Sequence, residues 1–368
     1  MEEPVKEPGG ADSSIVVSII VPARNEESCL APCLQSLIRQ TGVDFEILVV
    51  DDNSSDRTAD IAKGFGVRVI SAATPTMGHS GKCNAAQTGA DVARGEWLLF
   101  TDADTVHEPG SLAAAVAEAV TGGVALLSYS PKQEVKTFWE KALMPVIFAE
   151  LAKKYRPADI NSPGSQSAAA NGQYLLVQRA AYYACGGHTS VAGTLLEDVA
   201  LARAIKQSER RIRFRFGGEA VRTRMYRGFA QMREGWTKNL ALLFPHASNL
   251  AMRRGLEFLA MTAGISMGAV AAGEGSTAYA TVAMGAAVLI WLRFLIRIRA
   301  AHFGWGANML AVAGLPVFVY LLLRSDYRYR NGKSITWKGR EYKAPGGLYA
   351  TQVSPAVSPA RGMGEVKS

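Results

Sequence analysis

The first third of the chain alternates apolar, β-branched runs with segments of helical periodicity. Such runs are typical of strands buried on both faces of a parallel sheet. The alternation predicts an α/β fold with a mostly parallel sheet flanked by helices, in which ligands bind outside the carboxyl ends of the strands. The predicted strands are residues 15–21, 45–50, 67–70 and 97–101, and the predicted helices are residues 28–40, 58–65, 84–93 and 111–120.

The last third of the chain is of a different kind. Three apolar segments each approach the ~20 residues that cross a ~30 Å hydrocarbon layer. The loop between the first two lacks Lys and Arg, whereas arginines follow the second, so these two are predicted to form a hairpin that returns to the cytoplasm. A third crossing would place the following basic residues outside, and Pro316 lies inside that segment, so two or three crossings remain open. The segments are residues 256–273, 277–296 and 305–323.

Charge and cysteine content narrow the function further. The chain has 40 Lys plus Arg against 32 Asp plus Glu, and the excess is concentrated in residues 203–254. A basic block just ahead of apolar helices suits anionic head groups or a diphosphate, and no nucleic-acid-binding pattern accompanies it. The four cysteines form no CxxC pair, so neither a zinc site nor a disulfide framework is predicted. No apolar signal segment opens the chain, so the large domain is expected in the cytoplasm.

Residues 138–148 form an amphipathic, aromatic segment that is too short, and too charged at its ends, to span a bilayer. It either lies at a membrane surface or covers the sheet.

Polar residues that follow the predicted strands carry the candidate chemistry. Asp102 and Asp104 come directly after the apolar run 97–101. Two carboxylates so close repel each other unless a cation intervenes, and Mg²⁺ or Mn²⁺ bridging them to a diphosphate meets that need. Lys82 stands at a helix entrance, where free N–H groups and its ammonium can bind phosphate. Taken singly, the polar residues of 22–27 and 51–57 are explained equally well as caps and turns.

In their order, five motifs of the chain resemble the family 2 glycosyltransferases of the GT-A fold. The resemblance covers residues 17–236. The motifs are VPARNEE at 21–27, VVDDNSSDRT at 49–58, GKCNA at 81–85, FTDADT at 100–105 and LLEDVAL at 195–201.

This resemblance implies an inverting transferase that moves a sugar from a nucleoside diphosphate, UDP, to a hydroxyl or carboxylate on a membrane lipid. It implies that Asp198 is the catalytic base that takes the acceptor's proton, with Glu197 as a supporting contact and Asp102 and Asp104 as metal ligands. An acid in the first turn of a helix is otherwise a dipole or cap feature. The nucleotide is expected on Pro22, Ala23, Asn25, Glu26, Asp51, Asp52, Lys82 and Asp102.

One motif departs from the family pattern. Residues 231–236, QMREGW, stand where many processive members carry Gln-x-x-Arg-Trp. Alignment on Trp236 puts Gly235 at the Arg position and Met232 at the Gln position, so polymer synthesis is not predicted. Arg233 and Trp236 are expected at the diphosphate or the acceptor.

The segments 224–227 and 337–340 resemble membrane-attached members that glycosylate single lipids, including hopanoid-associated, carotenoid-acid and ceramide glucosyltransferases. We therefore expect a multi-pass protein of the cell membrane with a cytoplasmic catalytic domain. The expected regions are a disordered tail (1–14), a GT-A domain (15–250), a membrane region of two to three helices (255–324) and a basic tail (325–368).

Two other functions remain open. Transfer to a polyprenyl phosphate, in the manner of dolichyl-phosphate mannose synthases, would make Asp198 less important as a base because that acceptor is already anionic. A nonenzymatic membrane binding protein or transporter with a degenerate nucleotide-binding domain is the alternative of another class.

Overall fold

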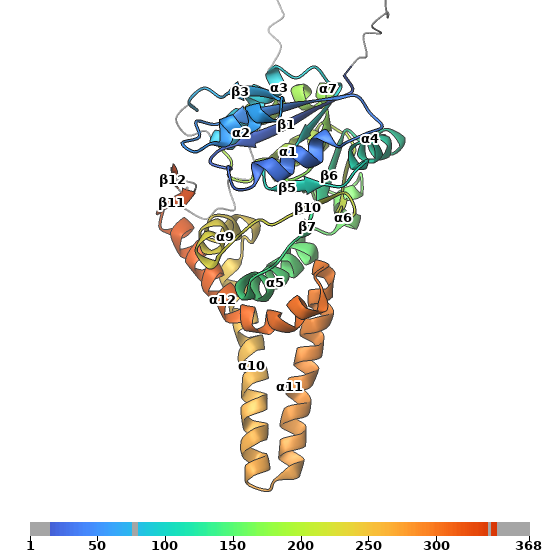
Figure 1. Ribbon diagram of the computed structural model, residues 1–368. Helices are drawn as coiled ribbons and strands as arrows, with labels where there is room; N and C mark the ends of the chain where they lie inside the picture. Colours follow the sequence, from blue (N-terminus) through green and yellow to red (C-terminus); the bar gives the residue numbers. More distant parts are fainter. Residues whose placement is uncertain (1–14, 76–79, 338–339, 344–368) are drawn as a thin grey trace, which may run out of the picture.

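The computed structural model describes residues 15–75, 80–337 and 340–343. The expected tail 1–14 and residues 344–368 of the expected C-terminal tail lie outside the described residues. Figure 1 shows three parts: an α/β unit, a helical layer formed by α5, α9 and α12, and a long hairpin of α10 and α11 that projects from this layer.

The α/β unit is built on a seven-stranded sheet in the order β3-β2-β1-β4-β8-β6-β9. The first four strands are parallel, as predicted, and β6 is parallel to β9. The sequence pattern did not predict β8, which runs antiparallel to both of its neighbours. The bounds are β1 (Val17–Ala23), β2 (Phe45–Asp51), β3 (Arg68–Ser71), β4 (Trp97–Phe100), β6 (Leu126–Ser130), β8 (Leu175–Gln178) and β9 (Ile212–Phe216).

Helices cover both faces of this sheet, and a buried apolar cluster lies on each face. On one face, a Cβ at Gly89 would lie 2.5 Å from Ile20 Cγ2. Glycine therefore lets α3 pack closely on β1, and this packing fixes the position of Lys82 at the start of α3. The helices are α1 (Leu30–Ile38), α2 (Thr58–Gly64), α3 (Gly81–Asp91), α4 (Ser111–Thr121), α6 (Pro157–Asn161), α7 (Arg179–Ala184), η1 (Gly187–Val191) and α8 (Glu197–Gln207).

A small second sheet joins the α/β unit to the helical layer. It has the order β5-β10-β7, with bounds β5 (Thr105–His107), β7 (Lys132–Gln133) and β10 (Val221–Thr223). α5 follows β7, and α9 follows β10, so this sheet sets where both helices begin. A further β-hairpin, β11 (Ser334–Trp337) with β12 (Arg340–Lys343), lies beside α9.

The helical layer consists of α5 (Phe138–Lys154), α9 (Phe229–Leu243) and α12 (Trp305–Arg330) around one apolar cluster. Thr137 caps α5 by accepting the Glu140 N–H, and Glu140 in turn accepts the Lys136 N–H. The segment 138–148 thus belongs to a longer helix, which packs on α12 between the α/β unit and the hairpin (Figure 1).

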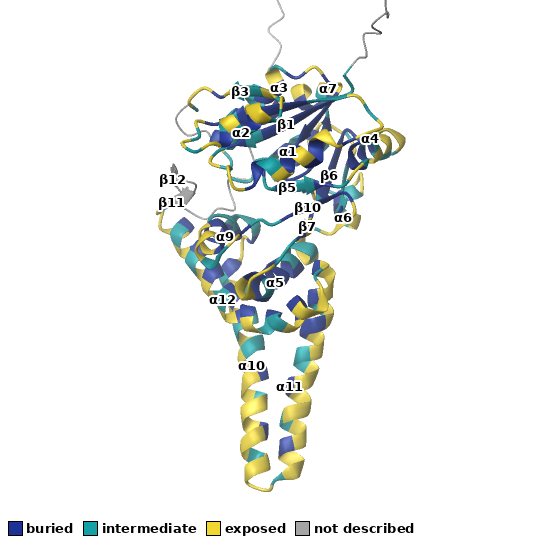
Figure 2. Ribbon diagram, in the orientation of Figure 1, coloured by how far each residue is buried: buried dark blue, intermediate teal, exposed yellow. Residues whose placement is uncertain are grey.

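The hairpin is formed by α10 (Ala247–Gly273) and α11 (Thr277–Ile298), which is followed by η2 (Arg299–Ala301). A Cβ at Gly264 would lie 3.0 Å from Ala287 Cβ, so small residues let the two helices approach closely. Figure 2 shows that both arms are largely exposed. Among the residues that the structure describes, three helices, α10, α11 with η2, and α12, are long and apolar enough to cross a membrane. Exposed apolar surface of this extent is typical of membrane segments.

Candidate active site

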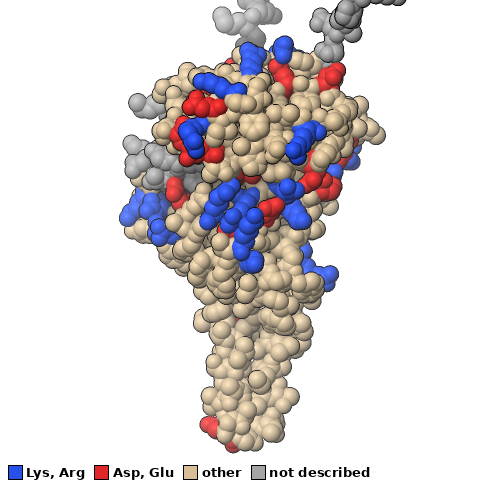
Figure 3. All heavy atoms as spheres, viewed as in Figure 1, with Lys and Arg blue, Asp and Glu red and all other residues tan. Residues whose placement is uncertain are grey.

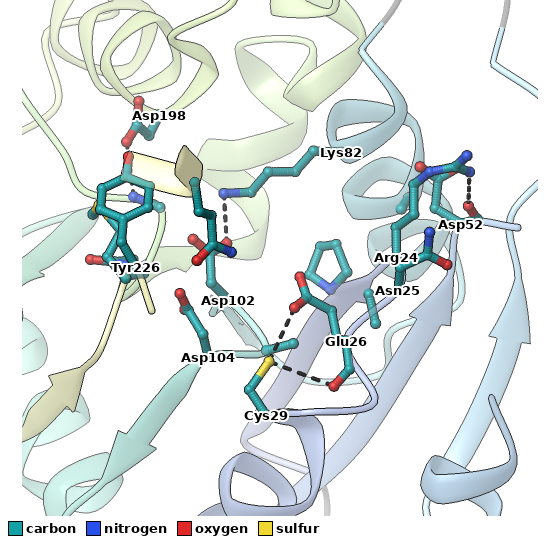
Figure 4. Close-up of a pocket in the computed structure, with 18 of the residues that line it drawn as sticks. Arg24, Asn25, Glu26, Cys29, Asp52, Lys82, Asp102, Asp104, Asp198 and Tyr226 are labelled. Carbon is teal, nitrogen blue, oxygen red and sulfur yellow. Dashed lines mark hydrogen bonds and ion pairs between the residues drawn. The ribbon is translucent and has the colours of Figure 1, made fainter. Parts of the chain in front are cut away.

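A pocket of about 410 Å³ opens at the carboxyl ends of β1 and β4, where the sequence predicted a ligand site. Figure 4 shows side chains converging on it from the loop after β1, the start of α3, the loop after β4 and the start of α8. α9 and the loop before it complete the wall. The predicted residues that line the pocket are Pro22, Ala23, Asn25, Glu26, Asp52, Lys82, Asp102, Asp104, Glu197 and Asp198.

The loops after β1 and β2 are held together by hydrogen bonds around Asn25. Its side-chain oxygen accepts the Ser55 N–H at 2.8 Å, and its own N–H donates to Ser54 Oγ at 3.1 Å. The Glu26 N–H donates to Thr58 Oγ1 at 2.8 Å. Asn25 is therefore no helix cap, because its amide bonds the neighbouring loop, and its backbone has the left-handed φ of 54° that Asn tolerates.

Lys82 occupies the centre of the site and joins two carboxylates. Its Nζ lies 2.6 Å from Asp102 Oδ1 and 3.4 Å from Glu197 Oε1. Burial alone would lower the pKa of Lys82, but these two carboxylates outweigh it and raise that pKa. The pKa of Glu197, which burial would raise, is lowered by Lys82 and Lys238. Lys82 therefore stays charged and keeps Glu197 ionised.

Asp198 is held differently, by backbone donors. The Gly172 N–H donates to its Oδ2 at 2.9 Å, and the Val199 N–H donates to its Oδ1 at 2.8 Å. Burial, together with the negative charge of Glu197, raises the pKa of Asp198 to about 6. The site thus contains two adjacent carboxylates whose pKa values are shifted in opposite directions.

Asp102 and Asp104 supply the hard oxygen donors that a divalent cation prefers. Within residues 15–75, 80–337 and 340–343, no group of three or more His, Cys, Asp or Glu side chains is placed to hold a metal ion. A cation here would take its remaining ligands from phosphate oxygens and water, which is how Mg²⁺ is commonly bound at nucleotide sites. The donor set therefore fits a metal bound together with a diphosphate.

Three predicted site residues lie outside the pocket lining. Asp51, the last residue of β2, accepts the Ser54 N–H at 3.3 Å through its Oδ1. Arg233 is exposed on α9, and Trp236 is buried in the helical layer, where its ring packs against Tyr226. A Cβ at Gly235 would lie 2.6 Å from Tyr226 Cε1, so Tyr226 fills the space that a side chain at 235 would need.

The structure adds residues that the sequence analysis did not single out. Gly172 contributes only its backbone N–H, and a Cβ there would lie 3.1 Å from Lys82 Nζ. Arg227 Nη2 donates to the Ser28 carbonyl at 3.4 Å and so bridges the two sides of the pocket. Lys238 reaches the same wall from α9, and burial lowers its pKa. Arg227 was predicted only as part of the segment 224–227, which resembles membrane-attached members, and Lys238 only as part of the basic block 203–254, so neither was assigned to the site.

Arg224 connects the pocket to α5. It also lines the pocket, and its guanidinium binds Glu140 in bidentate fashion, at 2.9 and 3.2 Å. Glu140 is 1% exposed, and although burial would raise its pKa, Arg224 lowers it. This buried pair fixes the loop that precedes α9 relative to the start of α5.

Comparisons with known proteins agree with this geometry. A sequence profile described as glycosyl transferase family 2 matches residues 18–186. These residues form a family 2 glycosyltransferase domain. The matched range contains the loops after β1, β2 and β4 as well as Lys82, whereas Glu197 and Asp198 follow it.

Relatives extend the similarity beyond this glycosyltransferase domain. The chain is 28% identical over 340 residues to 4,4'-diaponeurosporenoate glycosyltransferases from two strains of Staphylococcus aureus, covering 89% of this chain and 88% of each relative. Among solved structures, it is similar to a Pyrobaculum calidifontis mannosyltransferase in complex with GDP-Man and Mn²⁺, with 16% identity, a TM-score of 0.47, and coverage of 85% and 86% of the two chains. The protein is a glycosyltransferase, as its motifs predicted.

Proposed function

We propose that this glycosyltransferase transfers a sugar, with inversion, from a UDP-sugar to an apolar acceptor held in the membrane. The observation that carries the proposal is Asp198, a carboxylate fixed by two backbone N–H groups, with a pKa of about 6, in a pocket that also contains the Lys82–Asp102 ion pair.

On the donor side, the nucleotide would lie over Asn25, Glu26 and Asp52, with its diphosphate toward Lys82 and the acidic pair Asp102 and Asp104. Lys82 and Arg227 supply positive charge on two sides of this space. A bound Mg²⁺ or Mn²⁺ would be held by Asp102 and Asp104 and would neutralise charge on the departing diphosphate. Lys82 keeps Asp102 in place through its 2.6 Å ion pair.

On the acceptor side, Asp198 is the carboxylate best suited to remove a proton. A general base works best when its pKa lies near the operating pH, and a pKa of about 6 leaves Asp198 mostly ionised at pH 7. The lowered pKa of Glu197 makes that residue a poorer base and a better partner for Lys82. Attack by the deprotonated acceptor on the anomeric carbon requires no enzyme nucleophile, so inversion is the expected outcome.

The apolar hairpin and the named relatives support a proposal for the acceptor class. The exposed apolar hairpin would hold the pocket beside the bilayer, and the Staphylococcus aureus relatives are named for a diaponeurosporenoate acceptor. We propose an apolar lipid of the carotenoid-acid type, reached from a cytoplasmic catalytic domain of residues 15–250 anchored by residues 255–324. If the acceptor group is a carboxylate, it is already ionised near pH 7, and the demand on Asp198 falls.

The test is transfer by membranes that contain the full chain, given a panel of UDP- and GDP-sugars, with new glycolipids identified by mass spectrometry. We expect a product from a UDP-sugar, and the Asp198→Asn variant should bind UDP with unchanged affinity while losing transfer to a hydroxyl acceptor. Full hydroxyl transfer by that variant would refute the base assignment. Products formed on added polyprenyl phosphate instead of on an apolar lipid would refute the acceptor class.

A further inference from the structure

α12 is the most hydrophobic of the three long helices, with a mean hydropathy of 1.9 against 1.4 for α10 and 1.8 for α11. By composition it is therefore the best candidate to cross the membrane. Its packing against the rest of the protein, however, indicates that α12 does not cross. In the structure 44% of its apolar window is buried inside the protein, against 11% for α10 and 22% for α11. Figure 1 shows α12 running across the base of the hairpin and then up along α9, instead of lying beside α10 and α11.

The first half of α12 is in tight contact with α5. A Cβ at Gly314 would lie 3.1 Å from Leu143 Cα, so the two helix backbones approach closely at this glycine. Two residues later, Pro316 removes one backbone hydrogen bond from the helix, which permits a bend. α5 in turn belongs to the layer that carries the pocket wall, through the Arg224–Glu140 pair.

The second half of α12 is fixed to α9 by buried polar contacts. Ser325 Oγ donates to the Thr237 carbonyl at 2.7 Å and accepts the Ala241 N–H at 2.9 Å. Tyr329 donates to the Lys238 carbonyl at 2.7 Å. Because Lys238 lines the pocket, the end of α12 lies on the same side of the membrane as the catalytic domain. A helix that crossed would carry these groups to the opposite side and break all three bonds.

A cluster of four charged residues marks where the hairpin leaves the protein. Arg297 binds Glu257 through two hydrogen bonds of 2.8 Å, linking α11 to α10. Glu150 of α5 lies 2.9 Å from Arg254 Nε, which ties α10 to the helical layer. Between Glu257 and the tip, α10 contains no charged residue, and Figure 3 shows no blue on the projecting part of the hairpin, where acidic atoms are visible only at the tip.

Exposed aromatic residues lie on α12 and α5, two helices of the helical layer. Trp305, at the start of α12, is 60% exposed, and the Arg299 guanidinium lies 5.8 Å from its ring centre. On α5, Phe138 and Trp139 are exposed, and Trp139 contacts Phe229 of α9. Tryptophan beside arginine is typical of the membrane–water interface, where the ring sits among the head groups.

We propose that α12 lies in the head-group layer of the membrane and does not cross it, so that the α10–α11 hairpin enters and leaves on the side of the catalytic domain. The proposal rests on the membrane anchoring in the proposed function. It assigns that anchoring to α10 and α11.

The first test is the sidedness of single cysteines in the full chain. Asp60→Cys in the α/β unit, Glu274→Cys at the hairpin tip and Asn331→Cys after α12 are each made with Cys185→Ser, because the other three thiols are buried. Sealed membrane vesicles of known orientation are treated with an impermeant maleimide. We expect the thiols introduced at Asp60 and Asn331 to react from one side and the thiol introduced at Glu274 to react from the other.

Two other labelling patterns would contradict one of the two proposals. If the thiols introduced at Asn331 and Glu274 share a side opposite that of Asp60, α12 crosses and this inference is wrong, while the anchored glycosyltransferase stands. If all three react from one side, the hairpin does not cross, and the membrane anchoring of the proposed function fails with it.

A depth measurement separates a helix in the head groups from one buried deeper. Met309→Cys on α12 and Leu289→Cys on α11 both replace exposed apolar residues. After spin labelling in lipid vesicles, the label at Leu289 should be far more accessible to oxygen than to a water-soluble nickel complex, and the label at Met309 should favour oxygen much less. Equal depth for the two labels would overturn the proposal.

Discussion

The effect of the Glu197 charge on the pKa of Asp198 can be tested with the Glu197→Gln variant. At a pKa of about 6, Asp198 is ionised in roughly 90% of molecules at pH 7 and roughly 9% at pH 5, so kcat/KM should fall about tenfold from pH 7 to pH 5. Because the base acts only when deprotonated, activity rises with pH through this midpoint. Burial is the first cause of the raised pKa, and the Glu197 charge is the second.

Removing that charge should move the midpoint to lower pH, though not as far as the ordinary Asp value of 3.8, because burial remains. A shift of one unit, equal to about 1.4 kcal/mol, would raise the pH 5 to pH 7 activity ratio from roughly 0.1 to roughly 0.5.

The assay is UDP release during transfer to a hydroxyl acceptor, measured as kcat/KM between pH 4.5 and 8. Asp60→Asn, a change of an exposed acid on α2, is the matched control and should leave the midpoint near 6. A midpoint that stays fixed or rises in Glu197→Gln would refute the electrostatic reasoning. The acidic limb should also disappear in Asp198→Asn, and its survival there would assign the titration to another group.

Three further changes test the rest of the site and its support. Asp104→Ala should weaken metal-dependent UDP binding at least about tenfold, or ~1.4 kcal/mol, with little effect on binding in EDTA; calorimetry with and without Mn²⁺ checks this. Gly235→Arg should destabilise the protein by about 1–3 kcal/mol because Tyr226 fills that space, and an unchanged melting temperature would contradict it. Glu257→Gln should cost on the order of 3 kcal/mol by leaving Arg297 without its bidentate partner, and the double change with Arg297→Met should cost less; equal losses would argue against a buried pair.

The sequence predicted that loops after separate strands meet at one place, because parallel strands bring their carboxyl ends to one edge of the sheet. Asp52 and Asp102 follow separate strands, and both line the pocket. The role of Gly172 could not be predicted from the sequence, because almost any residue can donate a backbone N–H. Arg233 lies outside the pocket lining because it is two residues from the pocket-lining Gln231, and therefore about 200° around α9.

In the apolar last third of the chain, hydropathy alone could not predict which helices cross a membrane. A window score measures only how apolar a segment is, so it cannot tell burial against protein from burial in lipid. Ser325 and Tyr329 lie at the end of α12, and their partners are backbone carbonyls on α9 more than 80 residues earlier in the chain. The apolar run of β8 likewise carried no sign of its antiparallel direction, which depends on pairing with β4 and β6.

Only three residues separate the end of α9 at Leu243 from the start of α10 at Ala247. α9 forms one wall of the pocket, and α10 enters the hairpin directly, so no flexible tether lies between the site and its anchor. The height of the pocket above the bilayer is then a fixed dimension of the protein. If the hairpin anchors the site as proposed, a lipid whose reactive group protrudes to that height would react, and a chemically identical group held deeper in the membrane would not.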